Sequence, residues 1–166
     1  QHLPGLQLWC CFGSAPLLSD VQNRIDSDPR LRGRVHLLGR VPHQRIEQLM
    51  QAADLFVLGS HREGSGYSLI EALACGLPPV VTDIASFRVL TGQSAVGRLW
   101  SPGDARSLYN SLLLIASQAG PELRRWTREH FDAHLSFAAV GRKLRVAYED
   151  LLARKATSVQ AGALRS

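Results

Sequence analysis

Residues 59–76 read Gly59-Ser60-His61-Arg62-Glu63-Gly64-Ser65-Gly66-Tyr67-Ser68-Leu69-Ile70-Glu71-Ala72-Leu73-Ala74-Cys75-Gly76. The run just before them, 54–58, is nearly all apolar, which is typical of a strand buried on both faces of a parallel sheet. Gly64 and Gly66 permit a tight turn, and apolar residues then recur at helical spacing from Tyr67 to Cys75. The stretch therefore predicts a strand, a glycine-rich turn and a helix. In open α/β sheets such turns lie at the carboxyl edge, where ligands bind.

The chemistry of this turn suits a sugar nucleotide. Unpaired amide groups at the start of a helix, helped by the helix dipole, form a seat for a phosphate. Glu71 lies about one turn into the predicted helix, and its carboxylate can accept two hydrogen bonds from a vicinal diol such as a ribose. Glu63 lies before the helix, where it could contact a hexose hydroxyl. The alternative is a solvated Glu63 and a Glu71 that only stabilises the helix N-terminus.

The rest of the chain alternates strands with helices. Strands are predicted at Leu6–Phe12, Arg34–Leu38, Asp54–Leu58, Pro79–Thr82 and Gly97–Trp100. Helices are predicted at Pro16–Ile25, Gln44–Ala53, Tyr67–Cys75 and Ser86–Leu90, and a further helix is capped by Gly103-Asp104. Strands that alternate with helices imply an α/β fold with a parallel, doubly wound sheet and helices on both faces.

From Pro121 onward the pattern is wholly helical. The last predicted helix carries an amphipathic stripe made of Phe137, Val140, Leu144, Ala147, Tyr148 and Leu151. We expect one domain over residues 1–154, because 45% of the 166 residues are hydrophobic and supply a sizeable core. The last segment, 155–166, has little to bury and is predicted to be a disordered tail.

Charge and composition narrow the range of partners. The formal net charge of +5 favours anionic ligands or an anionic membrane surface. Arginines gather at Arg30, Arg32, Arg34, Arg40 and Arg45, although each could equally be a solvated residue at the edge of a loop. No aromatic residues interleave with them as a single-stranded nucleic-acid groove requires, so nucleic acid is not expected as a partner. No apolar stretch reaches the length of a membrane span.

Cysteine and histidine positions indicate neither disulfides nor a metal site. Cys10 and Cys11 are adjacent on a predicted buried strand, so reduced thiols and a cytoplasmic setting are expected. His130 and His134 are four residues apart but lack a third ligand, and no metal is predicted there. His61 follows a predicted strand, where it could contact a sugar or cap the loop.

The series of motifs resembles the nucleotide-binding domain of the retaining glycosyltransferases called group 1, or family four, which have the GT-B fold. Besides the turn at 59–76, the resemblance rests on Leu37-Leu38-Gly39-Arg40-Val41-Pro42, Ala52-Ala53-Asp54-Leu55-Phe56-Val57-Leu58, Gly76-Leu77-Pro78-Pro79-Val80-Val81-Thr82-Asp83, Val96-Gly97-Arg98-Leu99-Trp100-Ser101-Pro102-Gly103-Asp104 and Tyr148-Glu149-Asp150-Leu151-Leu152. Their order and spacing fit from about residue 6 to residue 153. The resemblance implies a Rossmann-like sheet that forms one half of a GT-B fold.

The resemblance also implies roles for individual residues. Glu63 would be the catalytic glutamate beside the transferred sugar, and Glu71 would bind the ribose hydroxyls. The backbone amides of 65–67 would approach the diphosphate and hexose, and the turn at 39–41 would line the base. The donor-binding set is then Glu71, Ser65, Gly66, Tyr67, Gly39, Arg40, Val41 and Gly13. No cofactor and no metal are implied, only a nucleotide diphosphate sugar as donor substrate.

The chain departs from the family pattern at the start of the domain. Members usually carry an Arg and a Lys there that neutralise the diphosphate, whereas the lysines of this chain are Lys143 and Lys155. The first predicted strand, Leu6–Phe12, resembles the second strand of the family. We therefore expect the first strand and an N-terminal acceptor domain to be missing upstream. The turn Gly13-Ser14-Ala15-Pro16 also lacks the second glycine of a Gly-x-Gly-Pro turn.

The resemblance implies the donor-binding domain of an enzyme that transfers a hexose from a nucleotide diphosphate sugar to an acceptor with retention of configuration. The fragment alone is expected to be inactive. Contact with the inner face of a membrane is compatible with the basic charge. Two alternatives stay open: a non-catalytic nucleotide- or sugar-binding module of the same fold, and another GT-B enzyme such as a phosphorylase or an epimerase.

Overall fold

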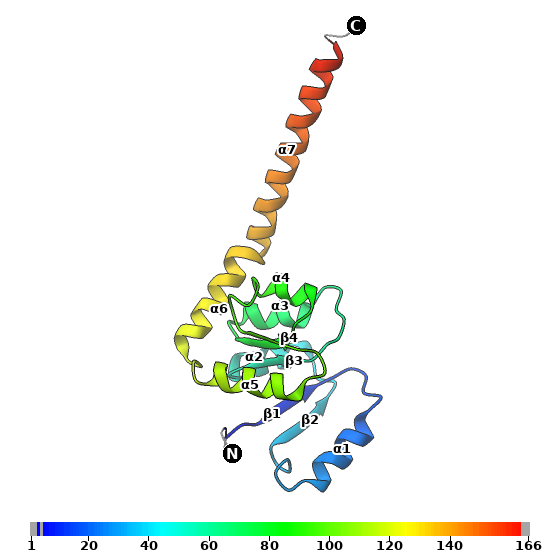
Figure 1. Ribbon diagram of the computed structural model, residues 1–166, viewed down its shortest axis with the longest axis vertical. Coiled ribbons are helices and arrows are strands. Elements are labelled where there is room, and N and C mark those ends of the chain that lie inside the picture. The colour runs from blue at the N-terminus through cyan, green and yellow to red at the C-terminus, as the bar shows by residue number, and fades with distance from the viewer. Residues whose placement is uncertain (1–2, 4, 164–166) are drawn as a thin grey trace.

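The computed structural model describes residue 3 and residues 5–163, without the side chains of residues 156–163. Strands and helices alternate along the chain as far as α5 (Figure 1). The strands are β1 (Leu8–Cys11), β2 (Val35–Gly39), β3 (Phe56–Leu58), β4 (Pro79–Thr82) and β5 (Arg98–Trp100). The helices are α1 (Leu18–Ser27), α2 (His43–Ala52), α3 (Tyr67–Ala74), α4 (Ala85–Leu90), α5 (Ala105–Ala116), α6 (Pro121–His134) and α7 (Phe137–Ala163). The predicted α/β pattern is confirmed.

All strand pairings are parallel, but the strands form two sheets where the sequence predicts one. β1 pairs with β2, and the second sheet has the order β3-β4-β5. Because β1 and β3 each have a partner on one side only, their side chains are less buried than those of central strands. Val57 of β3 is 36% exposed, and Trp9 of β1 is 51% exposed. The predictions that 54–58 and the strand with Cys10 and Cys11 are fully buried are therefore wrong.

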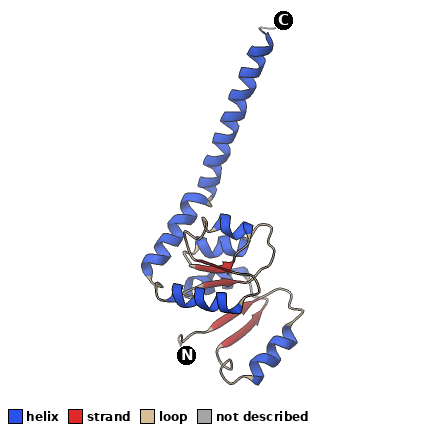
Figure 2. Ribbon diagram, viewed as in Figure 1, coloured by secondary structure: helices blue, strands red, loops and turns tan. Residues whose placement is uncertain are grey.

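The core lies around β4, the central strand of the second sheet, whose residues are all buried. Val81 belongs to an apolar cluster with residues of α3 and α4. Its neighbour Val80 points to the other face and clusters with Trp100 of β5 and Ile115 of α5. Successive side chains of a strand point to opposite faces, so helices cover both faces of this sheet (Figure 2). This arrangement confirms the doubly wound character predicted from the sequence.

Arginines of α6 tie the C-terminal ends of α2 and α3 together. Arg124 donates hydrogen bonds to the carbonyl oxygens of Ala53, at 2.6 Å, and Cys75, at 3.4 Å. Arg128 donates to the carbonyl oxygen of Ala74 at 2.7 Å. Cations are favourable at helix C-termini, where the last carbonyl groups lack partners within the helix. These bonds set the spacing of α2 and α3, between which a cavity lies.

α7 leaves the body of the molecule as a single long helix (Figure 1). Its apolar stripe is uncovered in the described part of the chain: Phe137 is 99% exposed, and Leu144, Tyr148 and Leu151 are 53%, 64% and 60% exposed. The amphipathic stripe predicted from the sequence is therefore present, and most of it faces solvent.

The predicted disordered tail, 155–166, falls on a segment that is helical as far as Ala163. Residues 164–166 lie outside the described residues, so both the disorder and the domain boundary at residue 154 stay predictions. Among the helices that the structure describes, none combines the length and the apolar character that crossing a membrane requires.

Candidate functional site

The glycine-rich turn enters α3 through Gly66, which adopts the left-handed conformation with φ 63° and ψ 36°. A Cβ at this position would lie 2.8 Å from Cδ1 of Leu90 and 3.3 Å from Cε1 of Phe87, so α4 packs directly behind the turn. No side chain caps the N-terminus of α3, and its first amide groups have no partners within the helix. A glycine turn followed by an open helix N-terminus is the arrangement that binds phosphate in many proteins.

Glu63 is held on the loop between β3 and α3. Its Oε1 accepts a hydrogen bond from Oγ of Ser60 at 2.9 Å, and the residue is exposed. Thr82, fully buried on β4, donates from Oγ1 to the carbonyl oxygen of Ser60 at 2.5 Å. The start of the loop is therefore anchored to the central strand, while the Glu63 carboxylate stays accessible to a ligand.

His61 lies on the same loop and is exposed. A Cβ added to Gly103 would lie 3.9 Å from Cε1 of His61, so the imidazole ring reaches the turn that precedes α5. The loops after β3 and β5, the two neighbours of β4, therefore meet above the carboxyl edge of the sheet. A sugar contact by His61 stays a prediction.

Glu71 is turned toward α2. Its Oε1 lies 4.0 Å from Nδ1 of His43, the first residue of α2, and its side chain is 43% exposed. Both residues line a cavity of about 560 Å³ between α2, α3 and α6. That volume lies in the range of small-molecule sites in proteins. Glu71 therefore presents its carboxylate to a space that a ligand can enter.

The same cavity is lined by Cys75. Burial, with a further contribution from the carboxylate of Glu47, raises the pKa of the Cys75 thiol. A thiol is nucleophilic only as the thiolate. Cys75 is therefore an uncharged, unreactive side chain in the lining of the cavity at physiological pH.

Gly13 and the turn at 39–41 come together at the carboxyl ends of β1 and β2. The amide of Phe12 donates to the carbonyl oxygen of Gly39 at 3.0 Å. A Cβ on Gly13 would lie 3.8 Å from Nη2 of Arg40, so the guanidinium group lies over this glycine. The turn is followed by Pro42 and His43, and the side chain of His43 lies beside that of Glu71.

The predicted site residues thus fall into two groups. The first group lies on the loop after β3 and at the start of α3, and consists of Glu63, Ser65, Gly66 and Tyr67. The second group lies around the turn between β2 and α2, and consists of Glu71, Gly39, Arg40, Val41 and Gly13. The ligand contacts of both groups stay predictions.

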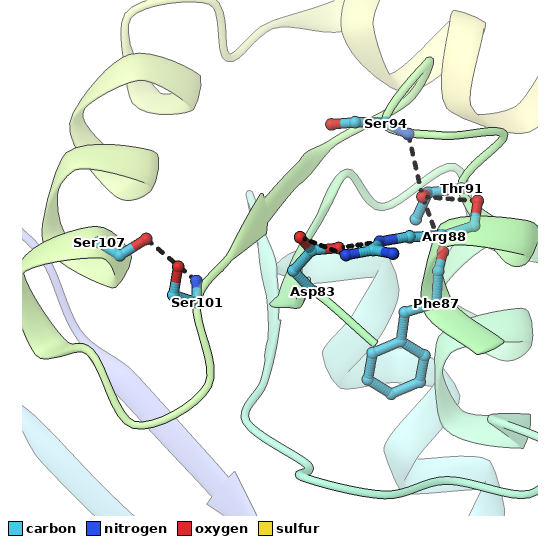
Figure 3. A network of polar contacts seen from close by, with 7 residues as sticks. All are labelled: Asp83, Phe87, Arg88, Thr91, Ser94, Ser101 and Ser107. Atoms are coloured by element: carbon cyan, nitrogen blue, oxygen red, sulfur yellow. Dashed lines mark hydrogen bonds and ion pairs between the residues drawn. The ribbon is translucent and has the colours of Figure 1, made fainter. Parts of the chain in front are cut away.

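Sequence reasoning missed an ion pair at the carboxyl end of β4. Arg88 of α4 donates to the two carboxylate oxygens of Asp83 at 2.5 Å and 3.0 Å (Figure 3). Hydrogen bonding to this guanidinium lowers the pKa of the Asp83 carboxyl group. On the next turn Thr91 donates to the carbonyl oxygen of Phe87 at 2.7 Å, which steadies the helix behind Gly66. An Asp and an Arg five residues apart are a weak signal, because that spacing is not a helical contact.

The two histidines of α6 lie beside each other, and one of them contacts α4. His130 hydrogen-bonds through Nε2 to the carbonyl oxygen of Leu90 at 2.9 Å, and its ring centroid lies 4.9 Å from that of His134. In the part of the chain that the structure describes, no group of three His, Cys, Asp or Glu side chains is arranged to hold a metal ion.

Comparison with known proteins settles the family. The protein-family model described as "Glycosyl transferases group 1" matches residues 14–130, which is most of the chain. The matched part includes the glycine-rich turn and Glu71. The chain belongs to the group 1 glycosyltransferases. The family predicted from the motifs is confirmed.

Curated relatives are similar over parts of the chain. The chain is 38% identical over 72 residues to the GPI3 subunit of phosphatidylinositol N-acetylglucosaminyltransferase from Saccharomyces cerevisiae, which is 43% of this chain and 16% of that protein. It is 31% identical over 103 residues to the UDP-Gal:alpha-D-GlcNAc-diphosphoundecaprenol alpha-1,3-galactosyltransferase of Escherichia coli, which is 62% of this chain and 26% of that protein. The chain therefore spans about a quarter or less of the length of these curated relatives.

Solved structures share the fold. Sucrose-phosphate synthase from Thermosynechococcus elongatus superposes with a TM-score of 0.71 at 24% identity, over 89% of this chain and 39% of that chain. Anabaena HepE in complex with UDP and glucose superposes with a TM-score of 0.70 at 20% identity, over 90% of this chain and 43% of that chain. At these identities the similarity shows the fold alone, and the fold is that of one part of a GT-B glycosyltransferase.

Proposed function

We propose that this group 1 chain is the donor-binding domain of a retaining hexosyltransferase. In the longer protein it would bind a nucleotide diphosphate sugar, from which a hexose passes to an acceptor. The observation that carries the proposal is the layout of α3. The helix begins after Gly66, and no side chain caps its first amide groups. Glu71, about one turn further along α3, lines a cavity of about 560 Å³.

Each part of the donor has a partner in this arrangement. The diphosphate would accept hydrogen bonds from the first amides of α3, next to the exposed residues Ser65 and Tyr67. The ribose diol would donate to Glu71, and hydrogen bonds to a charged group contribute about 1.5–3 kcal/mol each. The hexose would extend toward Glu63, and the base toward the 39–41 turn. The carbohydrate and the leaving diphosphate would thus be held in one orientation, and positioning and electrostatic stabilisation would supply the catalysis.

The names of similar proteins support the substrate class. HepE is described in complex with UDP and glucose, and the E. coli relative is named as a transferase from UDP-Gal to a diphosphoundecaprenol-linked sugar. A nucleotide diphosphate sugar is therefore proposed as donor here. A cytoplasmic setting is proposed as well, with peripheral contact to the inner face of a membrane, where lipid-linked acceptors lie.

The division into two sheets supports the proposal that one strand and an acceptor domain are supplied by a longer protein. β1 and β3 each carry an unpaired edge, and unpaired edges are sites where a further strand can add. A parallel strand between them would join the two sheets into one. The loop after that strand would end at the same carboxyl edge as Gly13 and Gly66 and could carry cations for the diphosphate.

An NMR titration of the chain with UDP, GDP and ADP tests the donor site. We expect saturable shifts with one of the three nucleotides and at least tenfold weaker binding by Glu71→Ala, because the ribose loses its charged acceptor. Glu122→Ala is the matched control, since Glu122 is an exposed carboxylate on α6 that pairs with Arg125. Equal affinity of Glu71→Ala and the wild type, with the fold intact by circular dichroism, would contradict the proposal.

A further inference from the structure

Ser60 is the residue of the β3–α3 loop that contacts the Glu63 side chain, and the donor site proposed above gives it no role. Its Oγ donates a hydrogen bond to Oε1 of Glu63 at 2.9 Å. A carboxylate has two acceptor oxygens, so this bond leaves Oε2 for a ligand. Ser60 is half-buried and Glu63 is exposed. The bond therefore joins the covered start of the loop to its accessible part.

The start of the loop is held by the two strands next to β3 in the second sheet. Thr82 of β4 is fully buried and donates from Oγ1 to the carbonyl oxygen of Ser60 at 2.5 Å. Trp100 of β5 pairs in register with Thr82 and is 8% exposed. Its indole ring lies against Gly59, because a Cβ added there would lie 3.4 Å from Cζ2 and 3.6 Å from Cη2. A hydrogen bond from the central strand and packing against a large ring thus fix the start of the loop.

The loop around Glu63 has less support of this kind. Residues 61–65 are exposed, and a Cβ added to Gly64 would meet nothing within 4 Å. Gly64 also permits backbone conformations that are closed to other residues. A glutamate side chain that binds a ligand loses rotamer freedom, and this loss weakens binding. The hydrogen bond from Ser60 removes part of that freedom before the ligand arrives.

We propose that Ser60 is a positioning residue for Glu63. Held in place by Thr82 and Trp100, it orients the carboxylate so that Oε2 accepts a hydrogen bond from a hydroxyl group of the hexose. This inference rests on the contact between Glu63 and the hexose proposed above. It extends the donor site to β4 and β5, which act on the hexose through the loop.

The first experiment tests the support of the loop without any ligand. Backbone ¹⁵N relaxation gives order parameters for the amides of His61, Arg62 and Glu63. We expect values of about 0.85 in the wild type, as in rigid backbone, and lower values in Ser60→Ala. Ser60→Thr keeps the hydroxyl group and should restore the wild-type values. Equal order parameters in Ser60→Ala and the wild type would overturn the inference, whatever the nucleotide results are.

Two further variants show where the support comes from. Thr82→Val removes the hydroxyl group that bonds to Ser60, and it should lower the same order parameters. If this variant is folded and leaves them unchanged, the role assigned to β4 is wrong; if it does not fold, Ser60→Ala decides. Ser101→Ala is the matched control, because the exposed turn after β5 contacts α5 through the Ser101 amide, which donates to Oγ of Ser107 at 3.1 Å (Figure 3). It should leave the loop unchanged.

The second experiment measures what the hexose adds to binding. Dissociation constants for UDP and UDP-glucose, and for GDP and GDP-mannose, are compared in the wild type and in Ser60→Ala. We expect Ser60→Ala to bind one sugar nucleotide about two- to tenfold more weakly, which is the effect of one hydrogen bond. Its affinity for the corresponding nucleotide without the hexose should stay the same, and Ser60→Thr should bind both ligands as the wild type does.

A double-mutant cycle tests whether Ser60 acts through Glu63. Glu63→Ala should weaken binding of the sugar nucleotide at least as much as Ser60→Ala does. Adding Ser60→Ala to Glu63→Ala should cost no further affinity, because the hydroxyl group then has no carboxylate to orient.

The outcomes separate this inference from the proposed function. If Glu63→Ala weakens binding of the sugar nucleotide and Ser60→Ala does not, the positioning role is wrong and the hexose contact of Glu63 stands. The same conclusion follows if the two losses add in the double variant. If Glu63→Ala binds as the wild type does, or if the wild type binds neither sugar nucleotide, the proposed contact with the hexose fails, and the positioning role fails with it.

Discussion

Gly66 determines whether α3 can begin where it does. Two independent constraints act on it: a left-handed backbone with φ 63°, and a Cβ position that would lie 2.8 Å from Leu90. A side chain here would both strain the turn and push α4 away from the start of α3. Because the amides at that start are the proposed diphosphate seat, the same residue serves the fold and the site.

Gly66→Ala should lower the free energy of unfolding by about 1–3 kcal/mol, through backbone strain and the clash with α4. Urea denaturation measures this change. Gly64→Ala is the matched control in the same loop, because a Cβ at Gly64 would meet nothing within 4 Å. A Gly66→Ala variant as stable as Gly64→Ala would show that the turn adapts without cost.

Asp83 makes stability depend on pH. Its pKa is lowered by Arg88, so the pair contributes stability above the unfolded-state value of about 3.9 and loses it as the pH falls through the folded-state value. Asp83→Asn should lower Tm at pH 7 by about 1–4 °C, a small effect because both side chains are partly exposed. At pH values below the folded-state pKa of Asp83, the two proteins should melt together. Asp54→Asn, which removes an exposed carboxylate beside β3, is the control for the loss of one negative charge.

Among the elements, α6 connects the two helices that line the cavity beside Glu71. Its arginines bond to the last carbonyl groups of α2 and α3, the helices that precede and follow β3 in the chain. The width of the cavity beside Glu71 therefore depends on residues more than fifty positions away in sequence. The sequence predicted that the chain is helical from Pro121 onward, where α6 begins, but could not show which of its arginines point inward.

Arg124→Met should lower the free energy of unfolding by about 1–3 kcal/mol, because the part-buried carbonyl group of Ala53 loses its partner. Thermal or urea unfolding measures the loss. Arg125→Met is the control on the neighbouring position, where the guanidinium pairs with the exposed carboxylates of Glu122 and Glu129. Its effect should stay below about 0.5 kcal/mol. Equal losses for the two variants would contradict the tie between α2 and α3.

At the scale of the whole molecule, the structure presents surfaces that lack a cover. β1 and β3 each have an unpaired edge, and α7 exposes Phe137, Leu144 and Leu151. The proposed donor site is built from α2, α3 and α6, and the proposal assigns the acceptor to a further domain. Transfer between two substrates requires both to be held in one geometry.

The isolated chain should therefore transfer no hexose from UDP-glucose or GDP-mannose to an acceptor, even where it binds the donor. Chromatographic product analysis of the chain and of the full-length protein makes the comparison. Measurable transfer by the 166-residue chain would refute the prediction. Phosphorolysis or an epimerised nucleotide sugar as the product of the full-length protein would replace the transferase proposal by one of its GT-B alternatives.

The sequence alone determined the family, the order of the elements and the place of the glycine-rich turn. These follow from local rules: apolar runs become strands, glycines permit turns, and helical spacing places Glu71 about one turn after Gly66. The strand Pro79–Thr82 was predicted with the bounds that the structure shows, because a run buried on both faces leaves little ambiguity. Asp104 was likewise predicted as the cap of α5, and it accepts hydrogen bonds from the amides of Arg106 and Ser107.

The tertiary structure decided which distant residues meet. The contact of His43 with Glu71, the arginines of α6 on α2 and α3, and the separation into two sheets all join positions that no sequence period relates. Periodicity reports how one element faces the core, but not which other element covers it. A strand becomes fully buried only when it has a neighbour on each side. The apolar sequences of β1 and β3 therefore predict buried strands, whereas β1 is largely exposed and β3 is only partly buried here.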